Sequence, residues 1–162
     1  MEACALTDVG QKRSMNQDFI YASTEPVGSL ENLFIVADGM GGHQAGDFAS
    51  RFVVENLVRF FETPYPDRDV HGILKEGIRK VNRELYERAS KTPELNGTGS
   101  TLVLATIKGN VLYVANIGDS RLYLLRGELE QITKDHSYVE ELVAMGKLKR
   151  GSRDYMEKEN II

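Results

Sequence analysis

Residues 100–133 constrain the fold of this chain more than any other segment. They form a series of short runs rich in β-branched, leucine and tyrosine residues, separated by glycine-containing turns. A Gly-Asn pair at 109–110 fits the two-residue turn of a β-hairpin, so we expect antiparallel neighbours. The first run is largely apolar on both sides, with Leu102, Leu104 and Thr106 on one and Val103, Ala105 and Ile107 on the other. Such a strand has to be covered on both faces, which predicts a sheet packed on a second sheet and flanked by helices.

Two more strand-like runs occupy residues 17–22 and 33–37, on either side of a loop that contains proline and glycine. Residues 45–62 carry apolar side chains three and four positions apart, which predicts an amphipathic helix: Phe48, Phe52, Val53, Leu57, Phe60 and Phe61. A second helix, capped by Asp69, should extend to about residue 89. Its expected buried face consists of Ile73, Leu74, Ile78, Val81, Leu85 and Tyr86.

The C-terminal part of the sequence predicts one more short helix, in the run SYVEELVAMG. Ser137 is its expected N-cap, Glu140 completes a capping box three residues later, and Gly146 ends the helix. From Lys147 onward the sequence becomes polar, which indicates a mobile loop. The chain as a whole is therefore predicted to be an α+β protein.

Composition excludes several classes of function. The chain has 162 residues, a net charge of -4 and interspersed charges, so it carries no electrostatic footprint for nucleic acid or for an anionic membrane. No run approaches the length of a membrane-spanning helix, and no leader sequence is recognisable. Cys4 is the single cysteine, which excludes an intrachain disulfide and indicates a small buried apolar residue. These features predict a cytoplasmic protein.

The run from Val36 to His43 carries the strongest chemical signal. An apolar strand leads directly into Asp38, which is followed by three glycines within the next four residues and then by His43. Carboxylates and backbone carbonyls are the oxygen ligands that Mg²⁺ and Mn²⁺ prefer, and glycine lets the main chain approach an ion closely. Asp38 is therefore the first candidate metal ligand. The alternative is a simple turn in which Asp38 bonds to nearby backbone and the glycines supply positive φ angles.

Two other clusters combine an acidic residue with a strand end. Arg13 precedes Asp18 by five residues, and an arginine fork can bind phosphate oxygens through two hydrogen bonds. Asp119 lies between two predicted strands, after a glycine and before a serine. Taken alone, each cluster is better explained as a surface residue or a tight turn. Three acidic strand ends in one small β-rich chain are less easily explained in this way.

Taken together, these clusters closely resemble the PP2C (PPM) family of metal-dependent protein serine/threonine phosphatases, in its bacterial branch. The resemblance runs from about residue 3 to residue 148. It is carried by T7-D8-V9-G10 with R13 and N16-Q17-D18, by D38-G39-M40-G41-G42-H43 with A45-G46, by G97-T98-G99-S100-T101, by N116-I117-G118-D119-S120-R121, and by T133-K134-D135-H136-S137.

The resemblance implies a β-sandwich of two antiparallel sheets with helices outside, in α/β/β/α layers. It also implies two divalent ions, Mn²⁺ or Mg²⁺, and a third in bacterial members, which activate water to attack a phosphoserine or phosphothreonine. By the same resemblance, Asp38 and the Gly39 carbonyl are ligands, Asp18 acts through water, and Asp119 belongs to the third ion. Arg13 would hold the substrate phosphate. Gln17 stands where relatives often have a glutamate.

His43 is a candidate general acid, because an imidazole that titrates near neutrality could protonate the leaving alkoxide. In eukaryotic relatives the histidine directly follows the Asp-Gly pair, whereas Met40 takes that place here. The alternative is a histidine that bonds to backbone at the start of a helix. His136 resembles a structural position of the family, and His71 falls within a predicted helix without a metal-binding pattern.

The chain resembles the N-terminal two-thirds of such a domain, and residues 137–162 would lead into its variable flap region. The family's later segments supply two more metal-binding aspartates that this sequence lacks. We therefore expect residues 1–162 to form a partial domain that binds ions weakly and has little or no activity alone. Uncovered strand edges could lead to a swapped homo-oligomer.

Three functions follow from these patterns. The first is hydrolysis of phosphoserine and phosphothreonine in proteins, which by resemblance would oppose a bacterial Hanks-type serine/threonine kinase. The second is a non-catalytic phosphoprotein-binding or regulatory module that retains Arg13 and Asp38. The third is a structural β-sandwich with incidental glycine turns, which would require several family stretches to occur together by chance.

Overall fold

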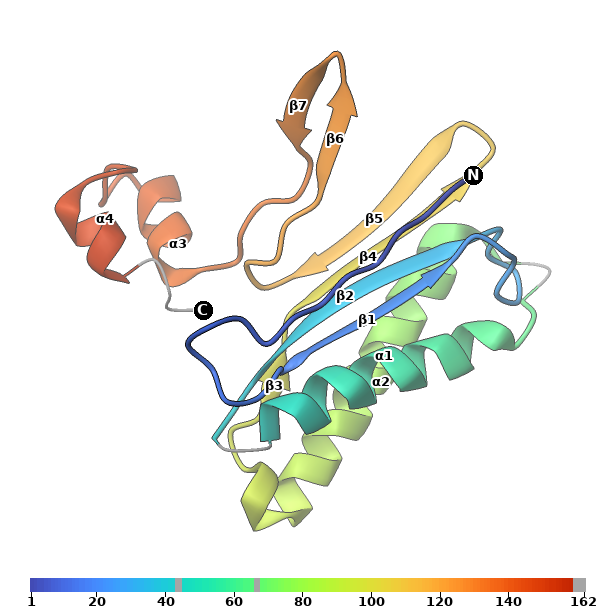
Figure 1. The fold of residues 1–162 in the computed structure, drawn as a ribbon, viewed down its shortest axis with the longest axis horizontal. Coiled ribbons are helices and arrows are strands. Elements are labelled where there is room, and N and C mark those ends of the chain that lie inside the picture. The colour runs from blue at the N-terminus through green and yellow to red at the C-terminus, as the bar shows by residue number, and fades with distance from the viewer. Residues whose placement is uncertain (43–44, 66–67, 159–162) are drawn as a thin grey trace.

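The computed structural model describes residues 1–42, 45–65 and 68–158. It shows one antiparallel sheet covered on one side by two long helices, α1 and α2 (Figure 1). The order of strands across this sheet is β1-β2-β4-β5, and the short β3 pairs with the end of β2. These strands comprise β1 (Asp18–Ser23), β2 (Leu33–Met40), β3 (Gly99–Ser100), β4 (Leu102–Lys108) and β5 (Val111–Ile117).

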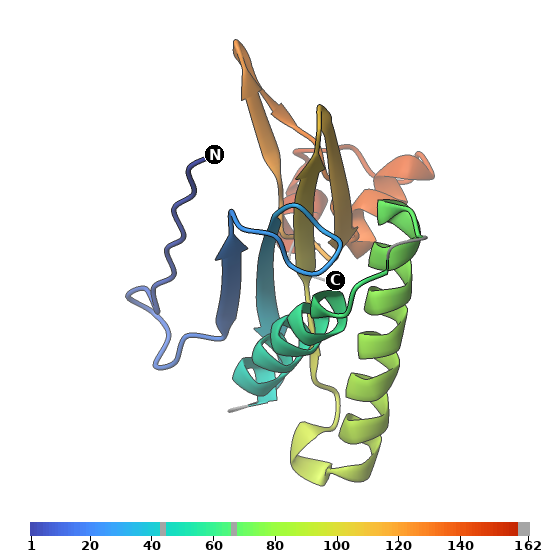
Figure 2. The same ribbon diagram turned by 90° about the vertical axis from the view of Figure 1, so that its right-hand side faces the viewer.

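The remaining elements follow the sheet or connect its strands. They comprise α1 (Ala45–Glu62), α2 (Val70–Lys91), the 3₁₀ turn η1 (Pro93–Leu95), the strands β6 (Tyr123–Arg126) and β7 (Glu128–Gln131), and the helices α3 (Tyr138–Ala144) and α4 (Arg153–Lys158). Strands β6 and β7 form a second, two-stranded antiparallel sheet. Figure 2 shows that the N-terminal segment runs on the side of the large sheet away from α1. The predicted α+β class with two antiparallel sheets and flanking helices is confirmed.

The core lies between the large sheet and the two helices, because both present apolar stripes to each other. Alternate β2 residues Leu33, Ile35 and Ala37 are buried beneath Leu57 and Phe61 of α1. The strand β4 is buried on both sides over its first five residues, as its pattern predicts. Glycine at 109 takes a positive φ of 57° and turns the chain into β5, which confirms the hairpin.

Most predicted elements are confirmed, and the differences have physical causes. The helix at 45–62 has the predicted bounds, and the Asp69 side chain caps α2 by accepting a hydrogen bond of 2.5 Å from the Gly72 amide. Tyr86 was expected to be buried but is 74% exposed, because it follows Leu85 by one position and turns out of the apolar stripe. Cys4 is exposed rather than buried.

The C-terminal part differs more from expectation. Ser137 is the N-cap of α3, yet its side chain makes no capping hydrogen bond, so the predicted capping box is wrong. The Glu140 carboxylate instead binds Arg150 and Tyr155. The segment predicted to be a loop after Lys147 contains the short helix α4. Over the described part of the chain, no helix is long and apolar enough to cross a membrane.

Candidate active site

Asp18 and Asp38 face each other across neighbouring strands. The register of β1 and β2 pairs them directly, with Asp18 at the start of β1 and Asp38 near the end of β2. The strand β2 extends three residues beyond the predicted limit because it gains partners on both sides there. Gly39 pairs with Ser100 of β3, and Met40 pairs with Gly99. The sheet therefore brings together two carboxylates that lie 20 positions apart in the sequence.

The electrostatic environment of Asp38 is unfavourable to its own charge. Asp38 remains exposed on the sheet, yet its partial desolvation raises the pKa of the carboxyl above its usual value, and the negative charges of Asp18 and Asp119 raise it further. A hydrogen-bonding contact with the Asp18 carboxyl acts in the same direction. The Arg13 guanidinium lowers the pKa of Asp38 and so partly compensates. Asp18, Asp38, Asp119 and Arg13 thus converge on one end of the sheet.

Gly39 is required by a close backbone approach. A Cβ placed on Gly39 would lie 1.8 Å from the carbonyl oxygen of Gly46, in the first turn of α1. The Gly39 amide also donates a hydrogen bond of 3.0 Å to the carbonyl of Gln17. That same carbonyl accepts a bond of 2.6 Å from the Ser50 hydroxyl. The end of β2, the start of α1 and the residue before Asp18 are therefore fixed as one unit.

Thr101 connects the Asp38 segment to the Asp119 turn. Its hydroxyl accepts a hydrogen bond of 3.0 Å from the Asp38 amide and lies 2.7 Å from the Ser120 hydroxyl. The Thr101 amide donates a bond of 2.8 Å to the Asp38 carbonyl. The Thr101 side chain is almost completely buried, at 1% exposed, so these bonds are shielded from water. Thr101 thus fixes the spacing between two of the acidic residues.

The loop that carries Arg13 is closed by side-chain hydrogen bonds. The Asn16 amide nitrogen donates a bond of 2.8 Å to the Thr7 hydroxyl, and the Asn16 amide oxygen accepts one of 3.0 Å from the Asp18 backbone. The Asp8 carboxylate accepts a bond of 2.7 Å from the Gly10 amide. Short polar side chains that bond to nearby backbone stabilise turns of this kind. They hold Arg13 beside the Asp18–Asp38 pair.

The turn that carries Asp119 is held from the other side by residues 133–136. The His136 backbone amide donates a hydrogen bond of 2.8 Å to the Gly118 carbonyl. Arg121 forms two-pronged hydrogen bonds with the Asp135 carboxylate, at 3.0 Å from Nε to Oδ1 and 2.6 Å from Nη2 to Oδ2. Paired bonds of this geometry are among the strongest between side chains. They join the stretch 116–121, which contains Asp119, to the stretch 133–137.

The structure therefore brings together four of the predicted site residues, Arg13, Asp18, Asp38 and Asp119, with Gly39 beside them. His43 lies outside the described residues. Within residues 1–42, 45–65 and 68–158, no three His, Cys, Asp or Glu side chains are grouped closely enough to hold an ion on their own. The negative charges of the aspartates thus influence one another, but a cation-binding site would need further oxygen ligands.

Two positioning residues were missed by the reasoning from sequence. The Thr98 hydroxyl lies 2.7 Å from the Ala45 carbonyl oxygen and 3.1 Å from the Met40 carbonyl oxygen, so its single hydrogen can be shared between them across the turn from β2 to α1. Thr101 links the aspartates as described. Both lie in the stretch Gly97–Thr101, whose only signal was its resemblance to the family. Their roles depend on β3 pairing with β2 across about sixty residues of sequence.

Comparison with known proteins agrees with this geometry. The family model for Protein phosphatase 2C, PP2C, matches residues 8–142. This chain therefore belongs to the PP2C family. The match includes every acidic site residue and Arg13, and it ends within α3.

Named relatives come from several bacteria. The chain is 39% identical over 145 residues to "Serine/threonine protein phosphatase PstP" of Mycobacterium tuberculosis, a match that covers 89% of this chain and 27% of PstP. It is 39% identical to "Protein phosphatase PhpP" of Streptococcus pneumoniae, over 100% of this chain and 66% of PhpP. For "Serine/threonine phosphatase stp" of Listeria monocytogenes the identity is 36%, with coverage of 100% and 65%.

Solved structures show the same fold. Serine/threonine phosphatase Stp1 from Staphylococcus aureus superposes with a TM-score of 0.85 at 34% identity, covering 97% of this chain and 62% of Stp1. The Mycobacterium tuberculosis phosphatase PstP superposes with a TM-score of 0.79 at 37% identity, covering 94% and 62%. The chain thus spans less than two thirds of these structures, and its identification as a PP2C-type protein is confirmed.

Proposed function

We propose that this chain supplies part of a catalytic domain that hydrolyses phosphoserine and phosphothreonine in proteins. The observation that carries the proposal is the convergence of three aspartates and one arginine at the end of the large sheet. A carboxylate whose pKa is raised by two like charges gains most from a bound cation. An arginine beside it provides a second positive charge, in a geometry suited to phosphate oxygens.

The donor atoms fit divalent cations of the hard, oxygen-binding kind. Asp38 and the Gly39 carbonyl would be direct ligands, Asp18 would act through water, and Asp119 would serve a further ion. Mn²⁺ or Mg²⁺, on which PP2C proteins generally depend, would supply a water that is readily deprotonated and positive charge near the phosphate. Two ions are proposed, with a third at Asp119. The ligands missing from this chain would come from a completed domain.

The residues of this chain then have separate tasks. Arg13 would bind the substrate phosphate and orient it toward Asp38, since its loop is fixed by Asn16 and Asp8. Thr101 would keep the Asp38 and Asp119 segments at constant spacing. His43 remains a proposed general acid, placed four residues after Gly39 in the chain.

Substrates and partners are proposed at the level of class. The relatives are named serine/threonine or protein phosphatases, which supports phosphorylated proteins as substrates. A bacterial Hanks-type serine/threonine kinase would perform the opposing reaction, in the cytoplasm. A swapped homo-oligomer of this chain is also proposed, because β1 and β5 are edge strands of the large sheet in the described part of the chain and could pair with another copy. Light scattering should then report a mass above that of a monomer.

Hydrolysis of a small aryl phosphate, with and without Mn²⁺, tests the proposed function. The assay should be run on the 162-residue chain and on a version extended to a complete domain. We expect metal-dependent turnover in the extended version and little in the chain alone. Turnover that does not depend on metal would contradict the proposed role of the cations. An extended domain that binds phosphopeptides without hydrolysing them would contradict the proposal and favour a binding module.

A further inference from the structure

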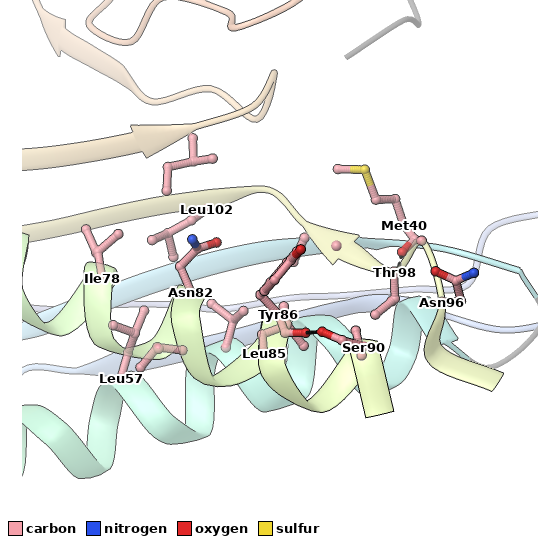
Figure 3. A pocket seen from close by; sticks show the side chains of 17 residues that line it. Met40, Leu57, Ile78, Asn82, Leu85, Tyr86, Ser90, Asn96, Thr98 and Leu102 are labelled. Carbon is pink, nitrogen blue, oxygen red and sulfur yellow. Dashed lines mark hydrogen bonds between the residues drawn. The ribbon is translucent and has the colours of Figure 1, made fainter. Parts of the chain in front are cut away.

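A pocket of about 500 Å³ opens beside the proposed active site (Figure 3). It lies between α2 and the end of the large sheet, with part of α1 beneath. Leu57, Val81, Leu85 and Leu102 contribute apolar surface to it. The volume is within the range of ordinary ligand sites, and it can hold a branched aliphatic or aromatic side chain.

The chemistry of this pocket is neutral. Among the described residues that line it, none is acidic, basic or histidine. Its polar groups are amides and hydroxyls, contributed by Asn82, Tyr86, Ser90, Asn96, Thr98 and Ser100. Burial of a charged group without a partner is strongly unfavourable, so the pocket selects against acidic and basic ligands.

Large apolar side chains are left exposed around the pocket. Tyr86, Ile117 and Met40 are 74%, 42% and 38% exposed, and all three line it. Figure 3 shows Tyr86 and Asn82 on the side of α2 that faces the pocket. Clustered exposed apolar side chains with polar neighbours are typical of binding surfaces.

The pocket is continuous with the residues that hold Asp38. Met40 follows Asp38 by two positions on β2 and forms part of the wall. The Ser100 hydroxyl donates a hydrogen bond of 3.2 Å to the Asp38 carbonyl, and the Thr98 hydroxyl donates one of 3.1 Å to the Met40 carbonyl. The pocket and Asp38 thus share the end of β2, although the alternation along β2 places the Asp38 carboxylate on the face of the sheet away from α1. A polypeptide bound with its phosphate at Arg13 and Asp38 would reach the pocket by passing around this end of the sheet.

We propose that this pocket binds an uncharged apolar side chain of the phosphoprotein, close in sequence to the phosphorylated residue. This inference rests on the proposed function and adds a determinant of substrate choice. A polypeptide suits the pocket because the exposed Asn82 amide offers both a donor and an acceptor, which matches the N–H and C=O of a peptide group. The phosphate gives attraction common to all substrates, whereas the pocket distinguishes between them.

Methyl NMR on the 162-residue chain in the presence of Mg²⁺ tests this inference directly. The probes are short peptides with a central phosphoserine and one leucine, moved through the other positions of an otherwise alanine sequence. At one leucine position we expect saturable shifts of the Leu85 and Ile117 methyl signals. Replacing that leucine by aspartate should weaken binding by about tenfold or more, because the buried apolar contact is lost.

Substitutions of pocket residues, with a matched control, test whether the peptide binds in this pocket. Asn82→Ala and Tyr86→Ala change exposed side chains and should weaken binding of the leucine peptide without unfolding the chain. Ala89→Phe fills the pocket and should abolish the leucine preference. Glu87→Ala is the control, since Glu87 is exposed on the same helix and does not line the pocket. Equal effects of Glu87→Ala and Asn82→Ala would overturn the inference.

The unphosphorylated form of the best peptide separates this inference from the proposed function. Suppose that the phosphorylated peptide shifts the Gly39 amide signal, whereas no peptide in the leucine series shifts the Leu85 methyl signals. The pocket proposal is then wrong, and the proposed phosphatase site stands. If leucine shifts Leu85 while phosphate changes nothing at Gly39, the link to a phosphorylated substrate is wrong. Shifts of Ile117 that depend on protein concentration alone would show self-association and would also overturn the inference.

Discussion

Two carboxylates in this protein occupy opposite electrostatic environments. Asp38 faces Asp18 and lies near Asp119, so its pKa is raised by burial and by like charges. Glu140 is only 6% exposed, yet its pKa is lowered because it accepts hydrogen bonds from Arg150 and Tyr155. The bond from Arg150 Nε is 3.1 Å and the bond from the Tyr155 hydroxyl is 2.8 Å.

This contrast supports the proposal that the Asp38 cluster is the functional one. The charge on Glu140 is satisfied by groups of this chain, which fold the segment after α3 back onto it, so its role is structural. The charge on Asp38 is opposed by its neighbours and compensated in part by Arg13. A cluster that opposes its own charge in the free protein is poised to bind a cation.

The largest expected effect is the loss of activity on replacing Asp38. Asp38→Asn in the extended domain should lower the metal-dependent rate of aryl phosphate hydrolysis on the order of 1,000-fold or more, because a direct ligand and its charge are removed. Steady-state kinetics with Mn²⁺ measure this. Glu140→Gln should leave the same rate within a few fold. Similar losses of activity in both variants would show that the Asp38 and Glu140 carboxylates do not differ in function.

Gly39→Ala should destabilise the protein by about 3 kcal/mol, since the new Cβ would overlap the Gly46 carbonyl. Gly42→Ala is the matched control in the same turn, because a Cβ there meets nothing within 4 Å. Urea unfolding followed by circular dichroism gives both free energies. An equal change in the two variants would show that the approach of β2 to α1 is not tight.

Thr101→Val should cost about 2 kcal/mol, because the buried Asp38 amide loses its side-chain acceptor while the volume is kept. It should also lower Mn²⁺ affinity in the extended domain by about tenfold, since positioning groups of this kind have effects of that size. Thr106→Val is the control: Thr106 is equally buried and donates to the Asn32 carbonyl, away from the aspartates. A matching loss of Mn²⁺ affinity in Thr106→Val would refute the linking role of Thr101.

The smallest expected effects are opposite pH dependences of stability. The pKa of Asp38 is higher in the folded state than its usual value of 3.8, so ionisation of this carboxyl destabilises the metal-free chain. The destabilisation develops as the pH rises from 3.8 through the raised pKa. Because the folded-state pKa of Glu140 is lowered, its contribution is present above its usual pKa of 4.5 and is lost as the pH falls through the lowered value.

Thermal unfolding across that pH range should therefore distinguish two variants. Asp38→Asn should raise the Tm of the metal-free chain slightly at neutral pH, since solvent screens the repulsion at an exposed carboxyl, and the gain should disappear in acid. Glu140→Gln should lower the Tm by a few degrees at neutral pH, with the loss disappearing in acid. If both variants changed the Tm in the same direction at neutral pH, the opposite environments of the two carboxylates would be disproved.

The sequence predicted the long elements well because their patterns are local. The apolar spacing of residues 45–62 gave the bounds of α1, and Asp69 gave the start of α2. The sequence also identified the residues that converge, Arg13, Asp18, Asp38 and Asp119. Their proximity in space, however, was predicted only from the resemblance to the family. The failures concern residues whose partners are distant. Glu140 looked like a local cap, but it prefers Arg150, ten positions later.

The α+β class, the antiparallel β4–β5 hairpin and the family could all be read from the amino-acid sequence, because periodicity, turn residues and short motifs are properties of neighbouring residues. The folded chain was needed to show that Asp18 faces Asp38, that Thr101 joins Asp38 to the Asp119 turn, and that Tyr86 borders an open pocket. Strand register and helix packing bring these residues together from distant segments, and no local pattern encodes the resulting contacts.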